Sequence, residues 1–300
     1  MKKTSIGGQA VMEGVMMKNL DRYAVAVRKP DHEIEVMTDE YKSLGSRYAV
    51  LGLPIIRGVV NFGESLYIGL KTLSYSSSFY EEEDYEPGKV EQFFTKIFGD
   101  KLESVLMGIT MVISVILALG IFMVLPFFLT NLIEGIIRVA LFLIYIWLIS
   151  KMEDIKRVFM YHGAEHKTIN CLEHGEDLTP ENIKKYSRLH KRCGTSFLLI
   201  VMIVSIVVFM FIRVDSLVWK FVLRILLVPV VAGISYEFIR LAGRSDSKIV
   251  NTLSKPGLYL QYFTTREPDE EMMEVAIKAV EGVFDWREYL RAMHNGELED

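Results

Sequence analysis

Residues 105–128 read VLMGITMVISVILALGIFMVLPFF, a run without a single charged side chain. A helix rises about 1.5 Å per residue, so this run is long enough to cross the roughly 30 Å hydrocarbon core of a bilayer. A core helix of a soluble protein is usually shorter and carries polar residues on one face. The stretch therefore predicts a transmembrane helix.

Three further apolar segments cover residues 132–150, 197–212 and 217–241. The last of them is interrupted by four charged residues, Lys220, Arg224, Glu237 and Arg240. Short turns join the segments in pairs. The fold that we predict is a membrane all-α bundle of four transmembrane helices in two hairpins, residues 105–150 and 197–242.

Basic residues are concentrated between the two hairpins, in residues 151–196. They are Lys151, Lys156, Arg157, Lys167, Lys184, Lys185, Arg188, Lys191 and Arg192. The turn inside each hairpin carries few. Loops rich in lysine and arginine stay on the cytoplasmic side, so residues 151–196 and both termini are predicted to be cytoplasmic. The predicted location is the cell membrane, with several crossings and the lipid bilayer as a partner.

The N-terminal part of the chain is more polar. In residues 1–50, short alternating apolar runs between Ile6 and Met37 are separated by turn signals and predict a small β-sheet. Residues 51–75 predict a helix that starts near Pro54 and lies either on the membrane surface or in the core of the soluble domain. Residues 76–104 are acidic at their centre and predict a linker.

The C-terminal segment, residues 243–300, also contains a predicted helix. Residues 258–265 are expected to be strand-like or irregular, and the helix starts within Thr265–Asp269. Its apolar face comprises Met272, Val275, Ala276, Ala279, Val280 and Val283. Packing of this face on the N-terminal sheet would form a small cytoplasmic α/β domain from both ends of the chain.

The charge pattern and the cysteines limit the function. The formal net charge is -4 and no basic stripe with interleaved aromatic residues occurs, so no nucleic-acid partner is expected. Both cysteines, Cys171 and Cys193, fall in the predicted cytoplasmic segment. Free thiols or metal ligands are expected there rather than a disulfide.

The sharpest functional signal is the sequence HGAEH at residues 162–166. On a helix, His162 and His166 point the same way, one turn apart, and Glu165 lies at the edge of the same face. In this H-x-x-E-H order two imidazoles can hold a metal ion while the carboxylate activates a water molecule. The motif therefore predicts a metal site next to a membrane.

Several motifs together resemble a known family. They are GGQAVMEGVMM at 7–17, LPIIRG at 53–58, HGAEH at 162–166, HKRCGTSF at 190–197, PGL at 256–258 and TTREP at 264–268. Their order is similar to that of the YqhQ-like family of bacterial multi-pass membrane proteins, a family with a domain of unknown function. The resemblance implies a multi-pass bacterial membrane protein, and the family's label implies a metal-dependent enzyme.

Two metal sites fit these residues. In the first, His162, His166 and the distant Glu237 bind zinc, a fourth position stays open, and Glu165 is the catalytic general base. In the second, His190 and Cys193 join the two histidines in a closed tetrahedral site that only stabilises the fold. A third reading holds no metal, and the histidines bond to carboxylates or lipid head groups.

Each site predicts a different function. The open site predicts a zinc-dependent hydrolase that acts on a peptide or lipid-linked substrate at the cytoplasmic membrane interface. The closed site predicts a non-enzymatic, metal-stabilised membrane scaffold or assembly factor. A transporter is disfavoured because no pair of broken helices is evident in the sequence. Whether the protein is an enzyme, its substrate and its oligomeric state are left open by the sequence.

The predicted topology can be tested by cysteine labelling. Cysteines placed at Thr130 and Asp215 should react with an external, membrane-impermeant reagent, because both positions lie in predicted outer turns. A cysteine placed at Asp177 should react only after permeabilisation. The unchanged chain measures the background from its own thiols, and the reverse accessibility pattern would contradict the topology.

Overall fold

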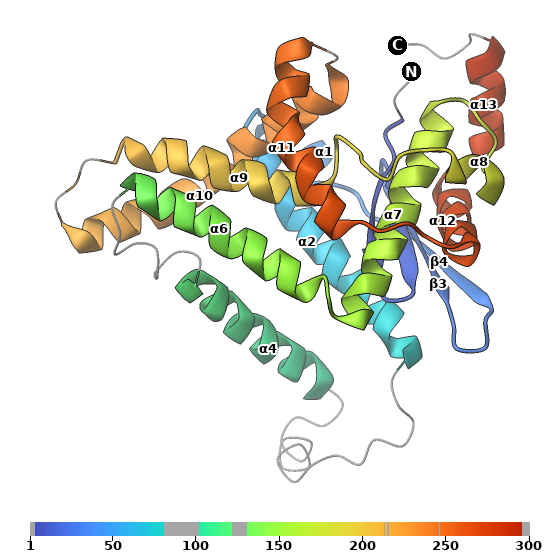
Figure 1. The fold of residues 1–300 in the computed structure, drawn as a ribbon, viewed down its shortest axis with the longest axis horizontal. Helices are drawn as coiled ribbons and strands as arrows, with labels where there is room; N and C mark the ends of the chain where they lie inside the picture. The colour runs from blue at the N-terminus through green and yellow to red at the C-terminus, as the bar shows by residue number, and fades with distance from the viewer. Residues whose placement is uncertain are drawn as a thin grey trace. The chain divides into compact units, whose positions relative to one another are not determined.

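The structure is a computed structural model that describes residues 4–80, 102–121, 131–212, 214, 216–245 and 247–295. The fold is mostly helical, with one four-stranded antiparallel sheet near the N-terminus (Figure 1). The chain divides into two compact units. The first contains Met1–Tyr80 and Tyr145–Asp300, and the second contains Glu81–Ile144.

The sheet is a simple meander in the order β1-β2-β3-β4. Its strands are β1 (Gly7–Val11), β2 (Gly14–Asn19), β3 (Arg22–Arg28) and β4 (Ile34–Glu40). Two-residue turns join the first three strands, since Val11 pairs with Gly14 and Asn19 pairs with Arg22. The predicted N-terminal sheet is confirmed.

Both faces of the sheet are covered. On β3, Ala24 and Ala26 point into one buried cluster, together with side chains of α7 (Glu153–Glu173) and α12 (Glu270–Val283). The alternate residues Tyr23, Val25 and Val27 point into another cluster, which includes Ile68 of α2 (Ile56–Ser77). This alternation is the two-residue period of a strand. It makes three layers, with α2 on one face and α7 and α12 on the other.

The C-terminal helix follows its prediction. All six residues of its predicted apolar face are buried in α12, and the helix packs on β2, β3 and β4. Asp269 caps it by accepting a hydrogen bond from the Met272 N–H at 2.8 Å. The short elements are α1 (Leu44–Arg47), η1 (Ala49–Gly52), η2 (Ser78–Tyr80), α8 (Pro180–Lys184) and α13 (Trp286–Asn295).

One expectation about local structure is wrong. Residues 258–265, predicted as a strand or irregular segment, belong largely to a helix, α11 (Lys248–Thr264). The helix contains Pro256 and Gly257, two residues that are unusual inside a helix. Yet a proline removes only one helical hydrogen bond, and Gly257 is needed because an added Cβ would lie 2.8 Å from the Ser196 Cβ. Residues 151–196 contain α7, and this helix carries His162 and His166 as the four-residue spacing predicted.

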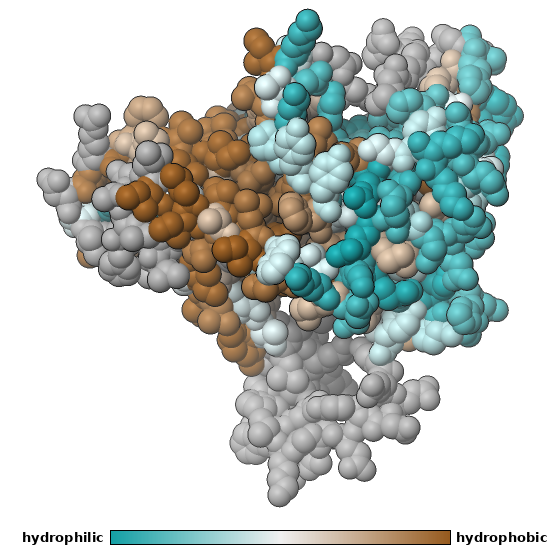
Figure 2. All heavy atoms as spheres, viewed as in Figure 1, coloured by the Kyte–Doolittle hydropathy of each residue, from teal (hydrophilic) through white to brown (hydrophobic). Residues whose placement is uncertain are grey.

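Two apolar helices, α9 (Gly194–Met210) and α10 (Leu217–Arg244), pack together in the first unit. In Figure 2 the hydrophobic residues gather over α9, and the hydrophilic ones gather over α7, α12 and α13. Among the described residues, α10 is the one helix that is long and apolar enough by itself to cross a membrane. A second span results only if Ile133–Ile149 and Glu153–Glu173 are counted as one broken span.

Among the described residues there is therefore one clear candidate span, and the four spans predicted from the sequence are not shown. Residues 122–128 of the first predicted span lie outside the described residues. The helix α9 is apolar throughout, but its 17 residues reach only about 25 Å. In the second unit, α4 (Leu102–Leu119) and the start of α6 (Asn131–Ile149) are described. Residues 81–101 of the predicted acidic linker lie outside the described residues.

The crossing of α2 and α10 gives a test of this packing. A Cβ added at Gly58 would lie 2.9 Å from the Gly233 Cα and 2.8 Å from the Tyr236 Cβ, whereas one added at Gly63 would meet nothing within 4 Å. We expect Gly58→Ala to destabilise the protein by about 1–3 kcal/mol through overpacking. Gly63→Ala, on the same helix, should stabilise it by about 0.5–1 kcal/mol. Thermal unfolding in detergent measures both, and equal effects would contradict the close crossing.

Candidate metal centre

The helix α7 carries His162, Glu165 and His166. The chain that follows α11 crosses this helix closely at Gly163. A Cβ at this position would lie only 1.9 Å from the Arg266 carbonyl oxygen, so only a glycine leaves room for the crossing. The Arg266 N–H donates to the Phe159 carbonyl at 2.8 Å and fixes this crossing. The glycine inside the H-x-x-E-H motif is therefore a packing requirement.

Backbone carbonyls orient both imidazole rings. The His162 Nδ1 lies 2.8 Å from the Thr264 carbonyl oxygen, and the His166 Nδ1 lies 2.6 Å from the Arg188 carbonyl oxygen. A carbonyl only accepts, so each Nδ1 carries a proton, and when either ring is neutral its lone pair lies on Nε2. The ring centroids are 4.4 Å apart. Both histidines thus offer the nitrogen that a metal ion would bind.

Cys193 reaches the same point from another element. It precedes the first turn of α9, and its Sγ lies 3.3 Å from the His162 Nε2 and 3.0 Å from the Thr195 Oγ1. Burial opposes a charge on the thiol, but the rings of His162 and His166 outweigh it and hold the pKa of Cys193 well below its usual value. Burial also lowers the pKa of His162, yet the Cys193 thiolate raises it to about 9.

The three ligand atoms form one cluster. A nitrogen of His162, a nitrogen of His166 and the Cys193 Sγ all lie within 4.8 Å of one another. Zinc bonds of about 2.0–2.3 Å place tetrahedral ligands roughly 3.5 Å apart, so small side-chain rotations would suffice to hold one ion. His162 and His166 belong to both of the predicted sites. Cys193, the third member of the cluster, belongs only to the predicted closed site.

Glu165 is buried beside this cluster. Its side chain is 4% exposed, and its Oε2 has no hydrogen-bond partner among the described residues. Burial raises the pKa of Glu165, while the His166 and His162 rings oppose that change. Strand β1 packs against it at Gly8, where an added Cβ would lie 3.2 Å from the Glu165 Cδ. A buried carboxylate oxygen without a partner is costly unless the site provides one.

His190 lies next to the cluster but outside it. Its ring centroid is 5.6 Å from that of His166, and its Nε2 is 3.9 Å from the Glu173 Oε2. Gln261 of α11 holds the loop, because it accepts from the His190 N–H at 2.8 Å and donates to the His190 carbonyl at 2.7 Å. The sequence reasoning missed Gln261. Its signal is a single amide in an apolar stretch, Tyr259–Phe263.

Glu237 is not brought to the histidines. Its carboxylate accepts two hydrogen bonds from the Arg57 guanidinium, at 2.6 and 2.5 Å, where α2 crosses α10. Arg240, three residues further along α10, has its Nη1 4.0 Å from the Glu237 Oε2. The Glu237 carboxylate is therefore neutralised by an ion pair elsewhere in the first unit.

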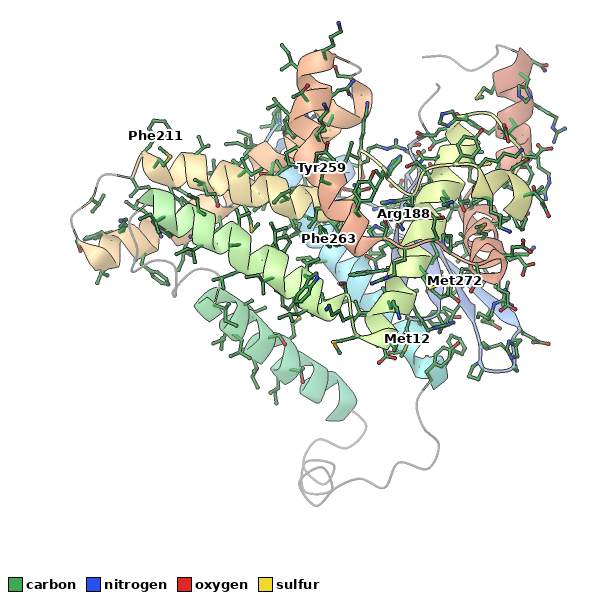
Figure 3. All side chains as sticks on the ribbon, viewed as in Figure 1. Met12, Arg188, Phe211, Tyr259, Phe263 and Met272 are labelled. Carbon is green, nitrogen blue, oxygen red and sulfur yellow. The ribbon has the colours of Figure 1, made fainter. Side chains whose placement is uncertain are left out.

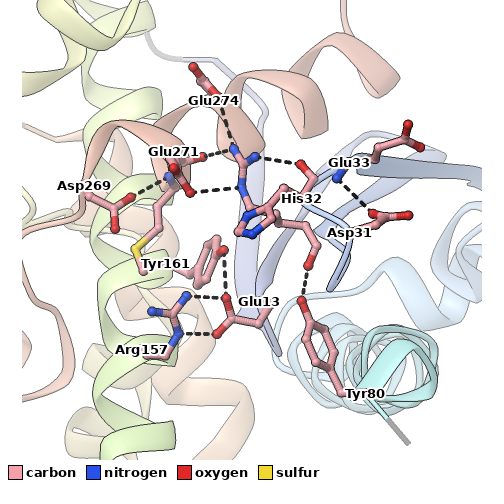
Figure 4. Close-up of polar contacts among 12 residues, drawn as sticks. Glu13, Asp31, His32, Glu33, Tyr80, Arg157, Tyr161, Asp269, Glu271 and Glu274 are labelled. Atoms are coloured by element: carbon pink, nitrogen blue, oxygen red, sulfur yellow. Dashed lines mark hydrogen bonds and ion pairs between the residues drawn. The ribbon is translucent and has the colours of Figure 1, made fainter. Parts of the chain in front are cut away.

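Glu13, at the turn between β1 and β2, anchors α7 to the sheet. Its carboxylate accepts hydrogen bonds from Arg157 and, at 3.2 Å, from the Tyr161 hydroxyl (Figure 4). Tyr161 directly precedes His162, so this contact fixes the helix next to the motif. The remaining thiol, Cys171, is buried away from the cluster, and burial raises its pKa to about 12.

A buried ion pair closes the far end of α7. Glu173 accepts hydrogen bonds from the Thr4 N–H at 2.9 Å and the Thr4 hydroxyl at 3.0 Å, and also from Arg192. Burial opposes its ionisation, but the neighbouring His190 ring and the charge of Arg192 outweigh it and lower the pKa of Glu173 to about 2. This contact ties the N-terminus to the residue before Cys193.

Comparison with known proteins identifies the family. Residues 53–286, which include all three cluster residues, match the family described as "Protein of unknown function (DUF1385)". The chain is also 37% identical over 287 residues to "Uncharacterized protein YqhQ" of Bacillus subtilis (strain 168), covering 91% of this chain and 90% of that protein. The chain belongs to the DUF1385 family, and the predicted resemblance is confirmed. No solved structure matches.

The Glu173 contact predicts a specific pH dependence. The pKa of Glu173 in the folded protein lies below its ordinary value. The stabilisation that its ionised carboxylate contributes is therefore complete above about pH 4.5 and is lost as the pH falls toward 2. It is worth at most roughly 3 kcal/mol. We expect Glu173→Gln to be less stable at neutral pH and to lose less stability than the unchanged protein between pH 5 and 3.

Thermal unfolding in detergent at a series of pH values tests this expectation. Glu176→Gln is the matched control, since this carboxylate lies three residues further on and its side chain is 41% exposed, compared with 1% for Glu173. Its pH profile should follow that of the unchanged protein. Parallel profiles for Glu173→Gln and the unchanged protein would contradict the buried ion pair.

Proposed function

We propose that the protein is a zinc-dependent hydrolase of the cell membrane, with its metal centre at the cytoplasmic interface. The observation that supports this function most is the cluster of His162, His166 and Cys193 with Glu165 buried beside it. Three ligands with a neighbouring carboxylate are the donor set of a catalytic zinc site, in which the fourth position is open.

The residues present suit zinc chemically. A thiolate with two imidazoles is a borderline-soft donor set that zinc prefers over magnesium or calcium. Both rings are oriented by carbonyls, as metal-bound histidines commonly are. The depressed pKa of Cys193 favours the thiolate form that binds metals. The Glu165 Oε2 has no hydrogen-bond partner among the described residues, and a group bound at the metal centre would provide one.

Each residue then has a role. When bound, zinc would polarise the scissile bond and lower the pKa of water. Glu165 accepts the proton of the attacking water and returns it to the leaving group, for which its raised pKa is suited. The carbonyls of Thr264 and Arg188 keep the two rings in place.

The membrane arrangement is part of the proposal. We place the four predicted spans, residues 105–128, 132–150, 197–212 and 217–241, in the bilayer with both termini in the cytoplasm. This arrangement is supported by the exposed apolar side chains of α9 and α10 and by the basic residues between the hairpins. Cys193 directly precedes α9, so the centre would lie where that helix enters the membrane. A peptide or lipid-linked substrate fits this position.

A metal-stabilised scaffold is the second candidate. It is favoured by one observation, the 5.6 Å between the ring centroids of His166 and His190. If the His190 ring turned away from Glu173, it would complete a four-ligand shell. Such a site would have no open position and would contribute only to folding stability.

Metal analysis of the purified protein tests the centre. We expect about one zinc ion per chain, lost in His162→Ala, His166→Ala and Cys193→Ser. His174→Ala is the matched control, because His174 ends the same helix but bonds to the Asn170 carbonyl instead. Glu165→Gln should keep the metal, since Glu165 is not a ligand. A metal-free protein whose stability is equal in all these forms would reject both candidates.

Cobalt substitution separates the two functions. Cobalt bound by Cys193 should show a thiolate charge-transfer band that is absent from Cys193→Ser. If the fourth position is open, added cyanide should change the visible spectrum, and His190→Ala should leave it unchanged. A closed site gives the opposite result in both measurements and would support the scaffold.

A further inference from the structure

The helix α11 has two unlike faces. One is buried against the rest of the first unit and comprises Ser254, Gly257, Leu260, Gln261 and Thr264. The other exposes large apolar side chains, among them Ile249 at 72%, Leu253 at 54%, Tyr259 at 62% and Phe263 at 48%. An apolar face of this size is expensive in water and usually has a partner.

The charges on α11 are all of one sign. It carries Lys248 and Lys255, both exposed, and has no acidic residue along its whole length. Tyr262 stacks on Tyr259, with ring centroids 6.5 Å apart, and the Arg188 guanidinium lies 5.8 Å from the Tyr262 ring. Tyrosine, lysine and arginine around an apolar face are typical of the boundary between a bilayer and water.

The position of α11 agrees with this composition. It begins four residues after the end of α10, the helix that can cross a membrane, and packs against the start of α9. Figure 1 shows that α11 runs across α9 and α10 rather than along them. In Figure 3, Tyr259 and Phe263 lie along α11, whereas Phe211 marks the opposite end of α9.

We propose that α11 is an in-plane anchor that lies in the head-group layer of the bilayer and binds anionic phospholipids. Its apolar face is continuous in sequence with α10, and its lysines complement the negative head groups. This inference rests on the membrane arrangement of the proposed function. It adds to that function a surface that binds lipids, and it predicts how deep in the bilayer the metal centre lies.

The anchor would also set where the substrate reacts. Thr264 at the end of α11 accepts the hydrogen bond of His162, and Gln261 holds the loop that leads to Cys193. Since a helix in the membrane plane keeps all its residues at a similar depth, the centre would lie at head-group level. The bond that is cleaved would then lie at the same level.

Spin labelling of the full chain in bilayers tests the depth of α11. Nitroxides are attached to Tyr259→Cys and Phe263→Cys, with Leu226→Cys on α10 as the lipid reference and Glu288→Cys on α13 as the aqueous reference. The natural thiols are buried, and the unchanged chain gives their background. Accessibility to oxygen, which dissolves in lipid, is compared with accessibility to a water-soluble nickel chelate.

We expect the labels on α11 to lie between the two references and closer to Leu226. If they match Glu288 while Leu226 lies in lipid, only the anchor is overturned. If Leu226 is also aqueous, the membrane arrangement fails with it. Dipolar coupling between labels at Tyr259 of two chains would assign the face to a second copy and overturn the anchor. Zinc content, measured separately, keeps the metal centre independent of all these outcomes.

Lipid dependence tests the charge of the anchor. Bilayers of phosphatidylcholine that contain phosphatidylglycerol should raise the melting temperature by roughly 4–8 °C over phosphatidylcholine alone. The double variant Lys248→Gln, Lys255→Gln should lose this increase. The control Lys185→Gln, Lys278→Gln removes the same charge elsewhere and should keep it. An increase that is equal in both variants would overturn the binding of anionic lipids by α11.

Discussion

At Gly163, α7 has no room for a side chain, because the chain that leaves α11 crosses it there with the Arg266 carbonyl. Much of the first unit depends on this crossing. Residues before it, in α11, supply the carbonyl that orients His162. Residues after it, in α12, cover the sheet. A larger residue would separate the motif from both partners at once, so the small residue in the motif is as much a structural requirement as its histidines.

The site is costly to build, and the surrounding core makes it tolerable. Glu165, His166 and Glu173 are nearly or fully buried on one helix, and buried polar groups destabilise a fold unless they are bonded. The His166 and Glu173 side chains find partners within the described residues. Glu165 keeps one oxygen without a partner. A buried carboxylate oxygen without a partner, beside a cluster of possible metal ligands, is typical of a functional site.

The sequence predicted those parts in which local pattern and tertiary role agree. The alternating runs of the sheet and the apolar face of α12 follow the periods of a strand and a helix, and both are confirmed. The motif was expected on a helix, and α7 is that helix, but its burial in the core was not predicted because its buried face contains Glu165, His166 and Lys167, which hide the period. α11 was missed because Pro256 suggests a break. Glu237 was given a ligand role because the sequence could not show that Arg57 reaches it.

The links between elements suggest how membrane and centre communicate. The chain runs from α10 through α11 and the Gly163 crossing into α12, so the helix beside the proposed membrane surface is continuous with the sheet domain. Within this path, α11 holds His162 directly and approaches Cys193 through Gln261 and the His190 loop. The ligand atoms themselves come from two elements, α7 and the start of α9. A shift of α11 would therefore move one ligand relative to another, and a rigid α11 is what allows a thiol and two imidazoles from separate elements to meet at one point.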